Sequence, residues 1–112
     1  MNYTNKVVLI TGATSGIGEA CAAAFGAAGA KLVITGRNPQ KLEHCAAQLR
    51  SKNYPVLPIL ADAGSEADNR RMAEETLAHY GQLDILVNNA GISMRALFQD
   101  LDLEVFRKVM DT

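Results

Sequence analysis

The sequence predicts an α/β fold, in which helices cover both faces of a parallel β-sheet. Three observations lead to this prediction. Four short apolar runs are continuous rather than alternating, which is typical of strands that are buried on both faces. Helical patterns lie between these runs, so strand and helix alternate along the chain. A glycine-rich turn joins the first run to the first helix.

The four predicted strands cover residues 7–10, 32–34, 56–60 and 85–87. Pro58 lies inside the third strand, and a proline cannot donate a hydrogen bond to a central ladder. We therefore expect the third strand at an edge of the sheet. With right-handed crossovers, strand order 3-2-1-4 places it there and corresponds to the N-terminal half of a doubly wound sheet.

The first two helices begin or end at recognisable residues. The first follows the glycine-rich turn and is expected to stop at Gly29. The second has Asn38 as its N-cap and Pro39 at its first position. Apolar spacing predicts the inner face of the first helix as Ile17, Ala20, Cys21, Ala24 and Ala28, and that of the second as Leu42, Cys45, Ala46 and Leu49.

The third helix is expected to open with Ser65 as its N-cap and to end at Gly81, and Asp68 occupies the capping-box position. A fourth helix is expected after Asp102, and the sequence stops inside it. The predicted inner face of the third helix is Met72, Ala73, Thr76 and Tyr80, and the apolar positions of the fourth are Leu103, Phe106, Val109 and Met110.

Composition argues against several classes of function. The chain has 112 residues, of which 48% are hydrophobic and 21% charged, which suits one globular domain. Its net charge of -1 argues against a nucleic-acid binder that neutralises phosphates and against a polybasic membrane anchor. No apolar run is long enough for a signal peptide or a membrane span, so we expect a soluble, cytoplasmic protein.

The cysteines and histidines lack the spacing of metal ligands, so no metal site is expected. Cys21 and Cys45 are interpreted as small buried hydrophobic residues on inner helix faces. His44 and His79 lie in polar helical stretches and are interpreted as solvated surface residues.

The glycine-rich turn at residues 11–18, T-G-A-T-S-G-I-G, predicts dinucleotide binding by a Rossmann-type fold. Gly12 allows a sharp turn, Gly16 allows the backbone to approach a pyrophosphate, and Gly18 allows close packing of helix on strand. The N–H groups of the helix N-terminus then face the phosphates. A purely structural turn is the alternative. The cofactor-binding residues predicted in this turn are Gly12, Thr14, Ser15, Gly16, Ile17 and Gly18.

The spacing T-G-x-x-x-G-x-G resembles that of the short-chain dehydrogenase/reductase family. Residues 88–91, N-N-A-G, follow the fourth predicted strand at the place where that family carries the same motif, and Asp62 after the third strand is another match. The resemblance extends from Lys6 through Thr112. It implies an oxidoreductase that transfers a hydride between a nicotinamide cofactor and an alcohol or carbonyl substrate. It also implies a homo-oligomer, because the last helix resembles a subunit-contact element of the family.

The end of the second strand favours NADP(H) over NAD(H). NAD enzymes carry an acidic residue there, but here Gly36 takes its place and Arg37 follows. A carboxylate would repel a 2′-phosphate, whereas a guanidinium can bind it with paired hydrogen bonds. A basic residue at the position of Arg37 is also similar to what NADP-preferring members of the family carry. Alternatively, Arg37 only solvates a loop.

The resemblance implies further cofactor contacts. Asp62 would accept a hydrogen bond from the adenine amino group, and the Ala63 N–H would meet the neighbouring ring nitrogen. A turn or N-cap role for Asp62 agrees equally well with the sequence. Asn88 is interpreted as a tie between strands, and Asp84 as the start of the fourth strand. By resemblance, the residues beside the adenosine ribose and the nicotinamide are Asn89, Ala90 and Gly91.

The family's Ser, Tyr and Lys catalytic residues have no counterpart here, and no catalytic residue is predicted. The Tyr and Lys are spaced Y-x-x-x-K, but no tyrosine of this chain has a lysine four residues later. An Asn assists these three residues in the family, and it follows a stretch that resembles residues 109–112. Its counterpart would therefore be the residue after Thr112. Residues 1–112 are therefore predicted to be the cofactor-binding half of an oxidoreductase, a Rossmann-type domain that is incomplete at its C-terminus. We expect this half to be inactive alone.

Two alternatives are a non-catalytic dinucleotide-binding module and a truncated fragment that needs a partner to fold. The substrate is not defined by the sequence. Ser93, Met94 and Arg95 either border a substrate cleft or form an ordinary loop.

Overall fold

Strand and helix alternate in the computed structural model, which describes residues 2–14 and 16–89. The predicted strands and the first three predicted helices are confirmed, with ends that differ by no more than two residues. The fourth predicted helix lies outside the described residues. The elements are β1 (Val7–Thr11), α1 (Gly16–Ala27), β2 (Lys31–Gly36), α2 (Pro39–Ser51), β3 (Val56–Leu60), α3 (Glu66–Tyr80) and β4 (Ile85–Asn88).

The four described strands form one parallel sheet in the predicted order, β3-β2-β1-β4. Pro58 in β3 lies opposite Ile34 of β2. The Ala61 N–H donates to the Gly36 carbonyl oxygen over 3.0 Å, so odd-numbered residues of this strand direct their backbone groups toward β2. The backbone nitrogen of Pro58 therefore points away from β2, where its missing N–H breaks no ladder hydrogen bond.

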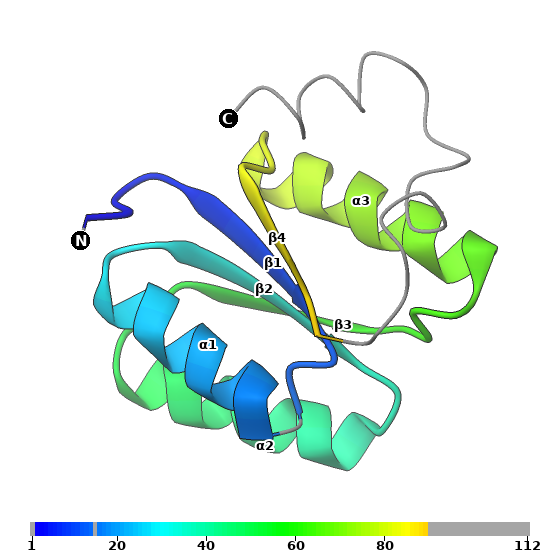
Figure 1. Cartoon of the computed structure of the whole chain (residues 1–112), viewed down its shortest axis with the longest axis horizontal. Helices are drawn as coiled ribbons and strands as arrows, with labels where there is room; N and C mark the ends of the chain where they lie inside the picture. Colours follow the sequence, from blue (N-terminus) through cyan, green and yellow to red (C-terminus); the bar gives the residue numbers. More distant parts are fainter. Residues whose placement is uncertain (1, 15, 90–112) are drawn as a thin grey trace.

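The sheet separates α3 on one face from α1 and α2 on the other (Figure 1). A hydrophobic core lies on each side of the sheet. Val7 and Leu9 of β1 pack on the side of α3, whereas Val8 and Ile10 pack on the side of α1 and α2. All four side chains are almost fully buried. Each contributes about 1.5–3 kcal/mol by its burial, which explains why the central strand reads as a continuous apolar run.

Side chains cap the second and third helices as predicted. The Asn38 Oδ1 accepts hydrogen bonds from the N–H groups of Gln40 and Lys41. The Ser65 Oγ accepts one from the Asp68 N–H over 3.3 Å. Gly81 ends α3 with a left-handed φ of 77°. Such a φ suits glycine, because it has no Cβ to clash.

The predicted capping box at Ser65 is wrong in its second half. The Asp68 Oδ2 accepts a hydrogen bond from the Asp62 N–H over 2.7 Å. The Ser65 N–H instead donates to the Asp62 carbonyl oxygen over 2.9 Å. The β3–α3 connection is a tight turn that brings Asp62 within reach, and an aspartate is one carbon shorter than the glutamate that usually closes a capping box.

The predicted inner face of α1 is also wrong. The predicted residue Ile17 is 72% exposed, and Ala20 and Ala24 are exposed as well. A Cβ at Gly26 would lie 2.4 Å from the Tyr54 ring, so glycine allows the closest approach there. In a helix rich in alanine and glycine, apolar spacing carries little contrast between faces. The buried residues of α1 are Gly18, Ala22 and Gly26.

The interpretation of the cysteines and histidines is mostly confirmed. Cys45 is buried at 3% exposure, whereas Cys21 is only half-buried because α1 is rotated from the predicted orientation. His44 and His79 are exposed. Within residues 2–14 and 16–89, none of the helices combines the length and the apolar character that crossing a membrane requires.

Candidate functional site

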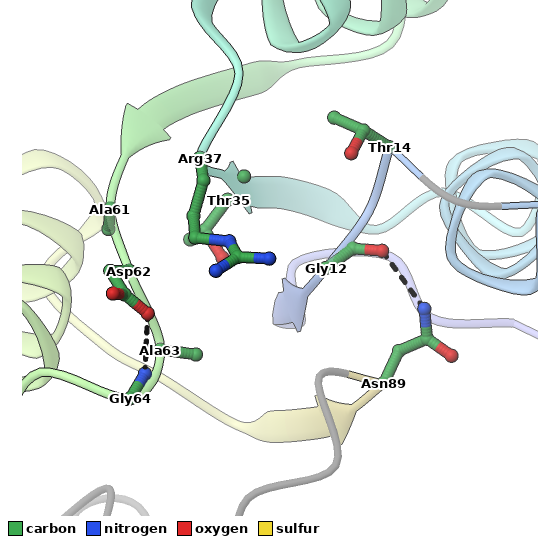
Figure 2. Close-up of a pocket in the computed structure, with 10 residues that line it drawn as sticks. Gly12, Thr14, Thr35, Arg37, Ala61, Asp62, Ala63, Gly64 and Asn89 are labelled. Carbon is green, nitrogen blue, oxygen red and sulfur yellow. Dashed lines mark hydrogen bonds between the residues drawn. The ribbon is translucent and has the colours of Figure 1, made fainter.

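A pocket of about 450 Å³ lies where the carboxyl ends of the four strands meet (Figure 2). Six of the predicted cofactor-binding residues line it: Gly12, Thr14, Arg37, Asp62, Ala63 and Asn89. The other lining residues are Thr35, Gly36, Ala61 and Gly64. In parallel sheets of this type, ligands bind at this edge and at the point where strand order reverses, here between β1 and β4.

The glycine-rich turn packs directly against the first turn of α1. Gly12 has a φ of 65°, which a side chain would strain. A Cβ at Gly18 would lie 2.4 Å from the Gly12 carbonyl oxygen, so the helix lies on the turn without room for a methyl group. At Gly16, by contrast, an added Cβ would meet no heavy atom within 4 Å apart from those of its chain neighbours and its own helix backbone. Gly12 and Gly18 shape the turn, and Gly16 leaves space beside the backbone.

Two neighbouring asparagines at the end of β4 hold this region. The Asn89 Nδ2 donates a hydrogen bond to the Gly12 carbonyl oxygen over 2.9 Å. The Thr11 Oγ1 donates to the Asn88 Oδ1 over 3.3 Å across the β1–β4 pair, which confirms the predicted tie between strands. Of the other predicted residues near this point, Ser15, Ala90 and Gly91 lie outside the described residues.

Asp84 performs the structural role that the sequence predicted. Its Oδ2 accepts a hydrogen bond from the Val7 N–H over 2.8 Å, and its own N–H donates to the Val7 carbonyl oxygen. These bonds fix the start of β4 beside the start of β1, at the opposite edge from the pocket.

Arg37 extends from the end of β2 into the space between Gly12 and residues 62–64 (Figure 2). It is exposed, and none of the ion pairs among the described residues involves it. Arg37 and Asp62 are the charged residues among those that line the pocket. A cationic side chain is thus available to an anionic group of a ligand.

The Thr14 side chain of the glycine-rich turn crowds the position before Arg37. A Cβ at Gly36 would lie 2.9 Å from the Thr14 Cγ2, which is closer than real Cβ contacts come. The Ala13 N–H also donates to the Thr35 carbonyl oxygen over 3.0 Å. These contacts join the end of β2 to the turn, so an acidic residue at position 36 would displace Thr14.

The third wall of the pocket is the turn after β3. The Asp62 Oδ1 accepts a hydrogen bond from the Gly64 N–H over 2.9 Å, which is the turn role that the sequence left open. Asp62 is exposed, and Ala63 is half-buried. Their predicted contacts with adenine stay a prediction.

Cys45 of α2 lies beneath the glycine-rich turn. Its Sγ donates a weak hydrogen bond to the Ala13 carbonyl oxygen over 3.8 Å. Burial, followed by the nearby Glu19 carboxylate, raises the pKa of the Cys45 thiol. The thiol therefore stays protonated and remains a donor near neutral pH. Within the part of the chain that the structure describes, no group of three His, Cys, Asp or Glu residues could hold a metal ion.

Sequence reasoning missed four lining residues, Thr35, Gly36, Ala61 and Gly64, as members of the site. Three of them carry no chemistry that marks a site, and Thr35 is buried. Their position at or just after the carboxyl ends of predicted strands is the signal that could have identified them.

Residues 6–112 match the family model of the short chain dehydrogenases. Over 114 residues, the chain is 45% identical to the mouse protein "Dehydrogenase/reductase SDR family member 7B", covering 96% of this chain and 34% of the mouse protein. The chain therefore spans about a third of the length of this relative.

Two solved structures have the same fold. A short-chain dehydrogenase/reductase from Serratia marcescens superposes with a TM-score of 0.77 and 31% identity, over 82% of this chain and 38% of that one. A metagenomic short-chain oxidoreductase in complex with NADP superposes with a TM-score of 0.74 and 32% identity, over 80% of this chain and 40% of that one.

Proposed function

The chain belongs to the short-chain dehydrogenase/reductase family, and from this premise we propose that it binds NADP(H) for an oxidoreductase. The bound cofactor would supply or accept a hydride in exchange with an alcohol or carbonyl group of a small substrate. The observation that carries the proposal is the pocket at the strand ends, where the glycine-rich turn and Arg37 face the same space.

The glycine-rich turn fits the pyrophosphate of a dinucleotide. The space beside Gly16 would admit the phosphates close to the backbone. The N-terminus of α1 begins at the same residue, and its N–H groups and dipole favour negative charge. Thr14 and Ser15 would add hydroxyl donors, and Ile17 and Gly18 would continue the contact into the helix.

Arg37 supports the preference for NADP(H). Its guanidinium has no ion-pair partner among the described residues and points into the pocket, so it is available to a 2′-phosphate. An acidic residue at position 36, which would bind the ribose of NAD, would have to displace the Thr14 side chain. One of the similar solved structures is a complex with NADP, which agrees with this preference.

The remaining contacts follow from the walls of the pocket. The turn after β3 would hold the adenine, with Asp62 accepting from the amino group and the Ala63 N–H donating to the ring. Asn89, Ala90 and Gly91 would border the adenosine ribose and the nicotinamide. Asn89 would do so while its side chain holds Gly12 in place.

The proposal gives none of these 112 residues a catalytic role. No tyrosine of the sequence has a lysine four residues later, so we expect residues 1–112 alone to bind the cofactor without turnover. A small-molecule substrate and a homo-oligomeric assembly of the whole protein are part of the same proposal.

Calorimetric titration of the intact natural protein with NADPH and with NADH tests the cofactor assignment. We expect NADPH to bind roughly ten- to a hundredfold more tightly, and Arg37→Gln to remove most of that difference. Arg50→Gln is the matched control, because Arg50 is an exposed arginine at the far end of α2 that pairs with Glu43. Equal affinities in the unmodified protein, or an unchanged preference in Arg37→Gln, would contradict the proposal.

A further inference from the structure

The outer edge of β3 carries backbone groups that no strand among the described residues pairs with. The Ala61 N–H donates to the Gly36 carbonyl oxygen, so the residues on either side of Ala61 direct their backbone groups away from β2. These outward groups include the Leu60 carbonyl oxygen and the Asp62 N–H. Both stand where β3 ends and the pocket wall formed by residues 61–64 begins.

Two side chains from the first turns of α3 bind these outward groups. The Arg71 Nη2 donates to the Leu60 carbonyl oxygen over 2.6 Å, and the Asp68 Oδ2 accepts from the Asp62 N–H over 2.7 Å. The two side chains also pair with each other at 3.5 Å. One acceptor and one donor thus take the place that a neighbouring strand would occupy at the end of β3.

We propose that Asp68 and Arg71 are positioning residues that hold the turn after β3 in the shape required to bind the adenine end of the cofactor. Only a few backbone hydrogen bonds fix this turn. The last toward the sheet is that of the Ala61 N–H, and the Asp62 carboxylate and carbonyl are used within the turn itself. The Asp68 contact therefore sets the direction of the peptide between Ala61 and Asp62, from which the chain continues into Ala63.

The charges of the pair make these contacts stronger than neutral hydrogen bonds. Asp68 has a side chain that is 30% exposed, so water screens it less than the surface carboxylates of the same helix. The inference rests on the proposed function, because it assigns the adenine to this wall. Neither residue touches the cofactor in this account, since both act through the backbone of residues 60–62.

Alanine and asparagine variants of Asp68 test the inference in the intact natural protein. The probes are 2′,5′-ADP, which carries the adenine and the 2′-phosphate, and nicotinamide mononucleotide, which carries neither. We expect Asp68→Ala to weaken binding of 2′,5′-ADP roughly tenfold and to change binding of nicotinamide mononucleotide less than roughly twofold. Asp68→Asn should restore most of the affinity, because its amide oxygen can still accept from the Asp62 N–H.

Arg70→Ala is the matched control. Arg70 lies next to Arg71 on the same helix and pairs with Glu74 at 3.0 Å, and both side chains are 60% exposed. This variant removes an arginine and an ion pair without touching the end of β3, so we expect no change with either probe. If Asp68→Ala does not fold, Arg71→Met supplies a second comparison, because it removes the hydrogen bond to the Leu60 carbonyl oxygen and the pairs with Asp68 and Glu75 but keeps the Asp68 carboxylate.

The possible outcomes separate the two levels of the proposal. Equal weakening of both probes, or unchanged binding of 2′,5′-ADP in the Asp68 and Arg71 variants, would overturn the inference while the proposed function stands. Failure of the unmodified protein to bind 2′,5′-ADP would overturn the proposed function and the inference with it. Loss of affinity in Asp68→Asn as large as in Asp68→Ala would also contradict the role of the Asp62 hydrogen bond.

Discussion

The side-chain amide of Asn89 donates a hydrogen bond to the Gly12 carbonyl oxygen over 2.9 Å (Figure 2). This contact joins the end of β4 to the glycine-rich turn after β1, across 77 positions of the sequence. Gly18 lies against both partners, since an added Cβ there would lie 2.4 Å from the carbonyl oxygen and 2.9 Å from the amide nitrogen. The proposed phosphate-binding turn is therefore built from two distant motifs rather than from its own glycines alone.

Replacement of Asn89 by alanine should weaken both stability and cofactor binding. Loss of the hydrogen bond to Gly12 is expected to lower the free energy of unfolding by about 1–2 kcal/mol. The turn also becomes less well ordered for the phosphates, so NADPH affinity should fall. Urea denaturation and calorimetric titration measure the two effects. Gln48→Ala, which truncates an exposed amide on α2, is the control, and an Asn89→Ala protein that matches it in both measurements would contradict this prediction.

Alanine at Gly18 should lower stability, whereas alanine at Gly16 should lower cofactor affinity. At Gly18 the new methyl group would collide with backbone, so we expect a loss of stability of about 1–3 kcal/mol. At Gly16 the methyl group would enter empty space, so stability should change by less than about 0.5 kcal/mol. NADPH affinity of Gly16→Ala should nevertheless fall roughly tenfold, because the methyl group occupies the space assigned to the pyrophosphate.

Thermal denaturation and NADPH titration of these two variants provide the comparison. A Gly16→Ala protein with normal NADPH affinity would show that the phosphates lie elsewhere. A Gly18→Ala protein of normal stability would show that the packing of α1 on the turn tolerates a side chain.

Conversion of the cofactor preference without a loss of stability should require a change at Thr14. Gly36→Asp combined with Arg37→Asn introduces an acid for the NAD ribose and removes the cation, so the preference should move toward NADH. The new Cβ would clash with the Thr14 Cγ2, so this double variant should lose stability. Adding Thr14→Ser removes that methyl group and keeps the hydroxyl, and we expect it to restore the melting temperature.

The ratio of NADPH to NADH affinity and the melting temperature together test this prediction. An unchanged ratio in the double variant would show that residues 36 and 37 do not select the cofactor. If Thr14→Ser does not raise the melting temperature, the contact between residue 36 and Thr14 is not the cause of the lost stability.

Stability should decline in alkaline solution partly because of Cys45. Burial and the Glu19 carboxylate raise the pKa of the folded-state thiol above its ordinary value of 9.0. A raised pKa means that the folded state disfavours the thiolate. The contribution of the protonated Cys45 thiol to the free energy of unfolding is therefore complete below about pH 9 and is lost as the pH rises through the folded-state pKa. Burial also raises the pKa of the Tyr80 hydroxyl above its ordinary value of 10.0. The contribution of Tyr80 to stability is therefore lost only as the pH rises above about 10.

Urea denaturation at a series of pH values separates these contributions. Cys45→Ala should reduce the decline that begins near pH 9 relative to the unmodified protein. Identical pH profiles for the unmodified protein and Cys45→Ala would refute this assignment. The loss of stability that Tyr80 causes at higher pH should be present in the unmodified protein and in Cys45→Ala alike.

Much of the fold could be predicted because its signals are local. A continuous apolar run marks a strand that is buried on both faces, and Pro58 marks an edge strand because it lacks an N–H. Asn38 and Ser65 cap helices through groups within three residues of themselves. Six predicted site residues line one pocket because parallel strands bring their carboxyl ends to the same edge.

The parts that could not be predicted depend on distant or unmarked contacts. The orientation of α1 depends on Gly18 and Gly26, which hydrophobic spacing does not recognise as inward-facing. Asp68 has the pattern of a capping-box residue, but its carboxylate binds Asp62 across the turn. Arg71 looks like a surface arginine, and its contact with Leu60 appears only when α3 is placed beside the edge of β3.

A crystal structure of the intact natural protein with NADPH tests the central claim most directly. We expect the 2′-phosphate about 3 Å from the Arg37 guanidinium, the pyrophosphate beside Gly16, and the adenine against the turn after β3. A cofactor bound in this pocket with its 2′-phosphate away from Arg37 would contradict the assigned NADP(H) preference. A cofactor bound outside the pocket would contradict the proposed function as a whole.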